Sequence, residues 1–193
     1  MSTLSPERLQ RFFERFPLLK PTLQKLNEAS IPFAIGGSGC LFVLGNERLP
    51  DDVDIFLPNE YHDQADAIFG CKSYYYTSAQ ENVRNSNPEG SHSMQLTSDL
   101  VLTIAGKTYD LHVTDDILAH RLEAIFEETP IFFYPPEDVL LTKALMQRGP
   151  DVGKHDIEDV RAFMQIYSDL RMGYALQRIQ ALGAEERVRT LLS

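Results

Sequence analysis

The spacing of apolar residues changes along the chain and divides it into helical and mixed segments. Across residues 5–29 apolar positions recur at helical spacing, and two prolines interrupt the pattern, so two short amphipathic helices are predicted. After Pro136 the spacing is helical again, with a glycine- and proline-containing break at residues 148–153. The helices predicted in this last part cover residues 137–147, 156–168 and 170–192.

Short apolar runs bounded by turn residues predict strands between these helical parts. The predicted strands cover residues 32–35, 53–57, 72–77, 93–97, 100–105, 108–113 and 131–134, and helices are predicted over residues 38–44, 61–69 and 116–121. The segment 78–92 is polar and has no hydrophobic period, which predicts a loop able to cover a site. The alternation predicts an α+β (mixed α/β) fold, with a boundary near Glu128 between a mixed part and a helical one.

Composition narrows the class of protein. With 193 residues, 43% of them hydrophobic, the chain is long enough to bury a core. Its net charge of -10 argues against a protein that mainly coats nucleic acid, because phosphate binding needs a concentrated positive surface. The two cysteines are too few for a disulfide framework. No apolar run has the length of a membrane span and the N-terminus lacks the order of a signal peptide, so a cytoplasmic location is expected.

A glycine-serine turn is the first candidate for chemistry. The apolar run 32–35 leads into Gly36-Gly37-Ser38-Gly39, which exposes backbone N–H groups at the start of a predicted helix. Such groups favour an anion, glycine lets a phosphate approach closely, and Ser38 adds a hydroxyl donor. Taken alone, a Gly-Gly turn after a buried strand is more often only a structural turn.

Two carboxylates form the second candidate site. Asp52 and Asp54 stand two residues apart on a predicted strand, so both side chains leave the same face while Val53 and Ile55 point into the core. Two adjacent carboxylates repel each other unless a cation lies between them, and a hard divalent ion is the natural ligand. Acids at a loop end that simply face water are an equally good explanation of this pair taken alone.

A third carboxylate lies on a later predicted strand. Asp110 alternates with apolar neighbours in Tyr109-Asp110-Leu111-His112-Val113, and the same alternation puts His112 beside it. The histidine would orient the acid or meet a substrate, although an ordinary surface histidine is the commoner case. A solvent-facing aspartate on an edge strand is also common, so Asp110 counts only together with the other acids.

In this order the motifs resemble the nucleotidyltransferase fold of the polymerase β type. The run from Pro136 to Lys143, followed by the run from Lys154 to Val160, is similar to bacterial nucleotidyltransferases of the AbiEii toxin-like group. The resemblance covers residues 31–160. It implies a polymerase β-like core over residues 1–128, which includes the N-terminal helices, and a C-terminal helical region over residues 129–193.

The resemblance also implies roles for individual residues. The turn would bind the β- and γ-phosphates of a nucleoside triphosphate, and two lysines would lie on helices that close over it, unless they merely belong to solvated helix faces. The strand acids would hold two Mg²⁺ ions, and the third acid would share one ion and help to activate the incoming hydroxyl. The phosphate-binding residues are Gly36, Gly37, Ser38, Lys143 and Lys154, and the catalytic metal ligands are Asp52, Asp54 and Asp110.

The function implied is Mg²⁺-dependent transfer of a nucleoside monophosphate from a triphosphate to a hydroxyl. The acceptor is a small molecule, an RNA 3′ end or a protein, and the acidic chain favours a small molecule or a protein over long RNA. A nucleotide-binding or toxin–antitoxin-type interaction module with weak or lost catalysis is the alternative, supported by Pro50, where the family often has Ser or Thr. A protein partner and a homodimer both remain open, and no membrane partner is expected.

Overall fold

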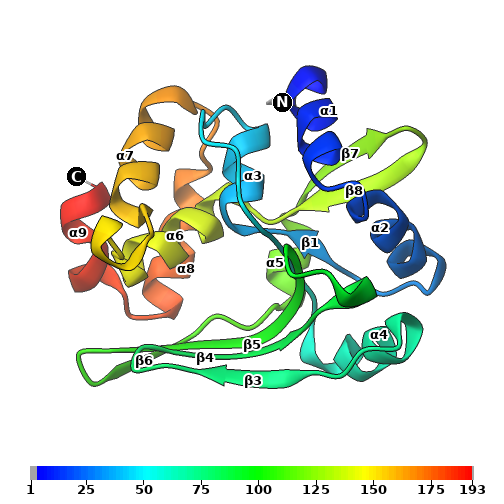
Figure 1. Cartoon of the computed structure of the whole chain (residues 1–193). Coiled ribbons are helices and arrows are strands. Elements are labelled where there is room, and N and C mark those ends of the chain that lie inside the picture. The colour runs from blue at the N-terminus through cyan, green and yellow to red at the C-terminus, as the bar shows by residue number, and fades with distance from the viewer. Residues whose placement is uncertain (1–3, 193) are drawn as a thin grey trace.

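The computed structural model describes residues 4–192, whose strands form one mixed sheet (Figure 1). Within these residues the strand order is β3-β4-β5-β2-β1-β8-β7, and β6 pairs with the C-terminal part of β5. The pairs β1–β8 and β2–β5 are parallel, and the other pairs are antiparallel. The strands are β1 (Ala34–Ile35), β2 (Val53–Phe56), β3 (Tyr74–Thr77), β4 (Glu81–Ser86), β5 (Met94–Ile104), β6 (Lys107–Asp110), β7 (Leu122–Phe126) and β8 (Thr129–Phe133).

The predicted mixed sheet flanked by helices and followed by a helical region is confirmed. The helices are α1 (Pro6–Arg15), α2 (Leu19–Glu28), α3 (Gly37–Val43), α4 (His62–Phe69), α5 (Asp115–Ala119), α6 (Pro136–Met146), α7 (Asp156–Ile166), α8 (Met172–Ala181) and α9 (Glu185–Leu192). Helix α1 begins as its sequence predicts, because the Ser5 hydroxyl accepts from the backbone N–H of Arg8 and proline occupies the first helical position. Figure 1 shows α6 to α9 gathered on one side of the strands β4 to β6.

Two hydrophobic clusters hold these layers together. The larger cluster packs α1, α2 and α3 against the central strands and includes Phe12, Leu23, Ile35 and Ile55, which are fully buried. The smaller cluster packs β5 and β6 against α6, α8 and α9. Helix α6 contributes to both clusters, so the helical region shares its core with the sheet. The boundary predicted near Glu128 falls in the turn of the β7–β8 hairpin, which places β8 within the sheet.

The prediction of a loop over residues 78–92 is wrong, because this segment contains the strand β4. β4 is hydrogen-bonded to β3 on one side and to β5 on the other, although most of its side chains are polar. Its residues lack a hydrophobic period because Val83 alone packs in the smaller cluster and the other side chains of both faces are polar. Glu81 and Asn85 line a cavity on one face, and Arg84 on the other face bonds to α4.

Three further elements differ from the prediction. The strands expected at residues 93–97 and 100–105 are one continuous strand, β5, in which Asp99 takes a left-handed φ of 52°. The helix expected over residues 170–192 is broken at Gly183, whose φ is 58°. Strand β7 was not expected, because its residues alternate between half-buried and exposed positions and give only a weak apolar signal.

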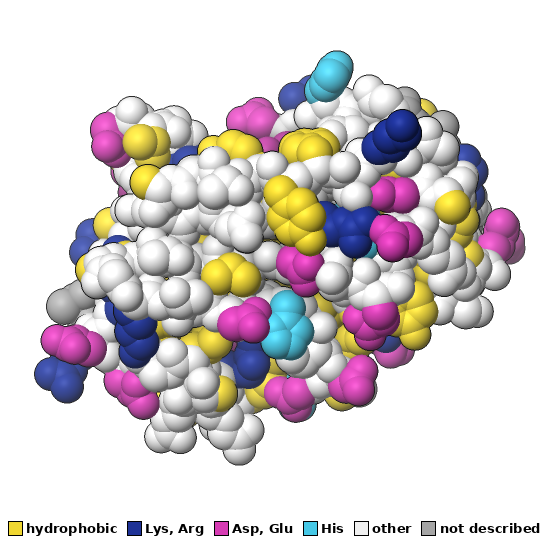
Figure 2. Space-filling model, turned by 90° about the horizontal axis from the view of Figure 1, so that it is seen from below, with side chains coloured by type: hydrophobic (Ala, Val, Ile, Leu, Met, Phe, Trp, Pro, Cys, Tyr) yellow, Lys and Arg dark blue, Asp and Glu magenta, His cyan; other side chains and the backbone are white. Residues whose placement is uncertain are grey.

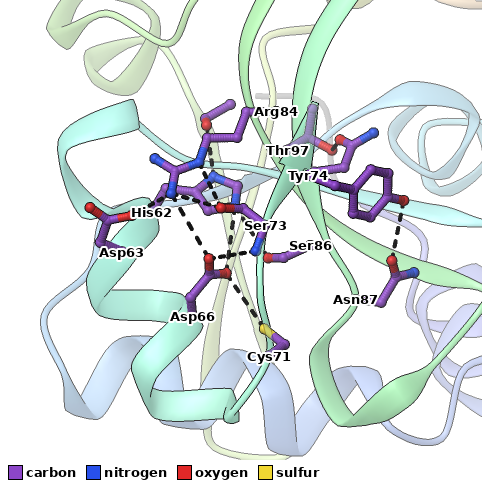
Figure 3. A network of polar contacts seen from close by, with 12 residues as sticks. His62, Asp63, Asp66, Cys71, Ser73, Tyr74, Arg84, Ser86, Asn87 and Thr97 are labelled. Carbon is purple, nitrogen blue, oxygen red and sulfur yellow. Dashed lines mark hydrogen bonds and ion pairs between the residues drawn. The ribbon is translucent and has the colours of Figure 1, made fainter. Parts of the chain in front are cut away.

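A buried polar network fastens α4 to the sheet (Figure 3). The ring of His62 lies between two hydroxyls, with Nδ1 2.7 Å from Ser98 Oγ and Nε2 3.2 Å from Ser86 Oγ. The guanidinium of Arg84 bonds to Asp63 on α4 and to Ser73 at the start of β3. These bonds give the polar side chains of β4 partners within the protein, so the strand can lie inside the sheet.

The surface carries both signs of charge. On the underside of the sheet, Figure 2 shows Lys and Arg side chains interspersed with Asp and Glu among the described residues. This mixture agrees with the acidic net charge in arguing against a broad phosphate-binding face there. Within residues 4–192, no helix combines the length and the apolar character needed to span a bilayer.

We expect the network around His62 to make stability depend on pH. Burial, aided by the positive charge of Arg84, lowers the pKa of His62 in the folded protein below its ordinary value of 6.5. The unfolded chain therefore binds a proton first as the pH falls, and the free energy of unfolding decreases below about pH 6.5 by at most ~1.4 kcal/mol per pH unit from this group. Urea denaturation of the wild type and of His62→Gln at pH 7.5 and 5.5 measures the difference.

The substitution should remove this component of the pH dependence, whatever it does to stability at neutral pH. His92→Gln is the matched control, because His92 is exposed, and it should keep the wild-type dependence. If the free energy of unfolding of His62→Gln changed between pH 7.5 and 5.5 by as much as that of the wild type, another group would be responsible.

Candidate active site

The glycine turn lies directly against the second strand acid. The backbone N–H of Gly36 donates to the carbonyl oxygen of Asp54 at 2.9 Å. Gly37 has a φ of 57°, and a Cβ there would stand 2.9 Å from Asp54 Oδ2. Glycine is therefore required at position 37 both by the left-handed backbone and by the approach of a carboxylate.

The turn residues do not all face the same way. Gly37 and Ser38 line a cavity of about 420 Å³. Gly36 is buried beneath the ring of Phe56, where an added Cβ would lie 2.4 Å from a ring carbon. The structure thus brings two of the three predicted turn residues to the cavity, while Gly36 packs against Phe56.

The predicted alternation of acids and apolar residues on β2 is confirmed. Val53 and Ile55 are buried in the larger cluster, and Asp52 and Asp54 line the cavity from the opposite face. Burial and then the negative charge of Asp52 raise the pKa of Asp54 from 3.8 to about 6. Two carboxylates in this condition attract a cation, because a cation offsets their mutual repulsion and the lost hydration of Asp54.

Lys143 is buried among carboxylates. Its ammonium group lies 2.8 Å from Asp159 Oδ2 and 3.2 Å from Asp156 Oδ1, and 8% of the residue is exposed. Arg48 bonds to Asp159 at 2.5 Å, and Arg148 Nε bonds to Asp156 at 2.8 Å. Lys143 lines the cavity as predicted, but two acids already compensate its charge, and it ties α6 to α7.

Lys154 is the contrasting case. The prediction that it lies on a helix is wrong, because it stands in the loop before α7. It also lines the cavity, is exposed, and its positive charge acts to lower the pKa of Asp54. Among the ion pairs of the described residues, none joins Lys154 to a carboxylate. Of the two predicted lysines, Lys154 therefore offers its charge to a ligand more readily.

Asp110 is not brought to this cavity, so its prediction as the third metal acid is corrected. Its neighbours Tyr109 and Leu111 point into the smaller cluster, and alternation along the strand turns Asp110 to the outer face of the sheet. The side chain is 60% exposed and lies 2.7 Å from His112 Nδ1. Across residues 4–192, no three His, Cys, Asp or Glu side chains form a group that could hold a metal ion.

Other polar residues occupy the positions near Asp54. Gln95 faces Asp54 across the parallel β2–β5 pair, and Glu81 lines the cavity from β4. The sequence gives no local sign of Gln95, because its place depends on the pairing of distant strands. Glu81 was missed because β4 was not predicted, although alternation with Val83 and Asn85 marks one strand face.

Comparison with solved structures identifies the fold. A Thermotoga maritima protein described as a nucleotidyltransferase superposes on 84% of this chain and 96% of its own, with a TM-score of 0.57 and 15% identity. The antibiotic-resistance factor ANT(2'')-Ia superposes on 95% of this chain and 94% of its own, with a TM-score of 0.53 and 16% identity. No protein-family model matches the chain, and a search of curated proteins gave no significant match.

The chain therefore has the nucleotidyltransferase fold that its motifs predicted. At these identities the likeness concerns the fold alone. Neither neighbour distinguishes the AbiEii toxin-like group, so that part of the resemblance stays a prediction. The roles of the cavity residues rest on the geometry described above.

We predict that replacing the two lysines of the cavity changes the stability of the protein to very different extents. Lys143→Met should lower the free energy of unfolding by about 3–5 kcal/mol, because it removes one partner of a buried ion-pair group. Lys154→Met should change it by less than about 0.5 kcal/mol, because no buried partner is left behind. Urea denaturation of the two variants measures both changes, and equal losses of stability would contradict the assignment.

The raised pKa of Asp54 can be measured directly. Carbon-13 NMR of the side-chain carboxyls should find Asp54 titrating near pH 6. Asp52→Asn should move this titration to lower pH, because it removes a neighbouring negative charge. Asp51→Asn is the matched control on the adjacent residue, and an equal shift in this control would refute the specific coupling of Asp52 to Asp54.

Proposed function

We propose that the protein is a Mg²⁺-dependent nucleotidyltransferase, which moves a nucleoside monophosphate from a triphosphate to a hydroxyl and releases pyrophosphate. One observation carries the proposal. Gly37 and Ser38 share a single cavity with Asp52 and Asp54, at the junction of β1, β2 and α3, on the fold of known nucleotidyltransferases. A phosphate-binding turn beside paired carboxylates is what transfer of a charged phosphoryl group requires.

The cavity fits a magnesium ion. Mg²⁺ is commonly held by one or two carboxylates and completes its shell with water and substrate phosphate oxygens. Asp52 and Asp54 provide that pair, and because burial and then the charge of Asp52 raise the pKa of Asp54, a bound cation would stabilise its charged form. Bound there, Mg²⁺ ions would lower the pKa of the acceptor hydroxyl and neutralise charge on the pyrophosphate, as a two-metal mechanism requires.

The chain's own residues would position the triphosphate. The absence of a side chain at Gly37 lets a phosphate approach the backbone, and Ser38 offers a hydroxyl and an N–H. Lys154 faces the same cavity and would approach the phosphate oxygens as a point charge. Arg148 is held in place by Asp156 and would add a second cation at fixed geometry.

The reaction is an in-line exchange at the α-phosphorus. The acceptor oxygen forms a bond to phosphorus while the bond to the pyrophosphate oxygen breaks, and the hydroxyl proton passes to solvent water. Because positioning and electrostatic stabilisation dominate such transfers, the protein needs few groups that react themselves. For the acceptor, the net charge of -10 favours a small molecule or a protein over long RNA.

A second candidate is a nucleotide-binding or toxin–antitoxin-type interaction module that catalyses transfer weakly or not at all. The position of Asp110 favours it, because the third acid predicted to activate the hydroxyl lies outside the cavity. Calorimetry with the four common nucleoside triphosphates, with and without Mg²⁺, separates the candidates when it is paired with a pyrophosphate assay. Tight nucleotide binding would favour the module if no pyrophosphate is released when RNA, protein or small-molecule fractions are offered as acceptors.

Two substitutions test the proposed site. Asp54→Asn should reduce Mg²⁺-dependent pyrophosphate release by at least about 100-fold, the usual scale for loss of a strong electrostatic contact in the transition state. Asp110→Asn, its control, should retain wild-type release because its side chain faces away from the cavity. Full activity of Asp54→Asn, or loss of activity in a folded Asp110→Asn, would contradict the assignment.

A further inference from the structure

We propose that Tyr74 and Tyr76 form a stacking site for the base of the bound nucleotide. The proposal rests on the proposed function and names the part of the substrate that the β3–β4 side of the cavity binds. It is based on the exposure of the two rings, the distribution of charge around the cavity and the bonds that hold the start of β3.

The three consecutive tyrosines of β3 divide between the two faces of the strand. Tyr74 and Tyr76 line the cavity, yet 45% and 49% of their surfaces remain exposed. Tyr75 points to the opposite face, where its hydroxyl donates to Asp99 Oδ2 at 3.4 Å. Two large aromatic rings left accessible in a cavity provide flat apolar surface for a planar ligand.

Charge is distributed unevenly around the cavity. Its cations come from the segment before β2 and from the α6–α7 side, and they are Arg48, Lys143, Arg148 and Lys154. The first three are bonded to Asp156 or Asp159, so within residues 4–192 Lys154 is the cation on this side that a ligand can contact without competing with those acids. Among the described lining residues, those of β3, β4 and β5 include no cation, and they are Tyr74, Tyr76, Glu81, Val83, Asn85, Gln95, Thr97 and Leu100. A triphosphate therefore turns toward the helices, and the uncharged nucleoside turns toward the strands.

The wall of the cavity that β3, β4 and β5 form also carries polar groups that can bind a nucleobase. Asn85 is paired in register with Tyr74, and its amide oxygen accepts from the Thr97 hydroxyl at 3.1 Å. Amide and hydroxyl groups beside an aromatic face are the groups that hold the edge of a stacked base. The wall thus combines a stacking surface with hydrogen-bonding groups.

The ring of Tyr74 is held in place before any ligand arrives. The hydroxyl of Tyr74 donates to Asn87 Oδ1 at 3.2 Å, and the Asn87 side chain donates to the carbonyl oxygen of Ser91 at 2.8 Å. Ser73, the preceding residue, accepts from Arg84 and donates its N–H to Asp66 (Figure 3). A ring whose position is fixed in this way loses little freedom on binding, which favours affinity.

Titration calorimetry with two probes tests the proposal. Mg²⁺-ATP carries a base, and Mg²⁺-tripolyphosphate carries only the phosphates. Tyr74→Ala and Tyr76→Ala should each weaken ATP binding by about 5- to 150-fold, the range measured for stacked bases, and leave tripolyphosphate binding unchanged. Tyr74→Phe keeps the ring but loses the hydroxyl bond to Asn87, so it should weaken ATP binding much less than Tyr74→Ala does.

Tyr75→Ala is the matched control, because it makes the same change on the same strand but on the opposite face. It should bind both probes as the wild type does, and thermal melting of every variant confirms that it is folded. ATP affinities in Tyr74→Ala and Tyr76→Ala that equal that of Tyr75→Ala would overturn the stacking site and leave the proposed function standing. A wild-type protein that binds neither probe would instead overturn the proposed function itself.

Discussion

The contact between Asp54 and the glycine turn is the constraint on which the cavity depends. Pairing of β1 with β2 places Ile35 opposite Ile55, and the hydrogen bond from Gly36 to Asp54 continues that pairing into the turn. Because Val53 and Ile55 are anchored in the core, the Asp54 carboxylate cannot withdraw toward water. The same packing that builds the sheet therefore sets the raised pKa of Asp54 and the close approach of Gly37.

A second set of acids fixes the other wall of the cavity. Asp156 and Asp159, both on α7, bind cations from three different segments, which are Arg48 before β2, Lys143 on α6 and Arg148 after it. Removing such charges from water costs several kcal/mol per ion, and the cost is offset only when many hydrogen bonds satisfy them, as they do here. The helical region is thus joined to the sheet by charge as well as by the shared hydrophobic clusters.

The sequence predicts those parts of the fold and site that depend on neighbouring residues. The turn, the β2 alternation and the helices α1 to α4 and α6 to α7 follow from local pattern and agree with the structure. Strand β4 could not be predicted, because Arg84 and Ser86 find their partners on α4 and become buried only after folding. Asp110 shows a different limit of the sequence. Alternation predicts that Asp110 shares a face of the strand with His112. Which of the two faces turns toward the cavity depends on how the strand pairs with β5 and packs against α6.

Gln95 changes the electrostatics of the cavity in a way that the motifs alone do not reveal. It lies beside Asp54 on the neighbouring strand, and an amide can accept a hydrogen bond there without adding negative charge. A third carboxylate at this position would raise the pKa of Asp54 further and would make the cavity depend more strongly on a resident cation. With Gln95 present, the pKa of Asp54 is raised to about 6, so this carboxylate is mostly charged at neutral pH and receptive to a cation. Under the proposed function, a divalent ion and a triphosphate would complement each other in charge and would arrive at this pair as one complex.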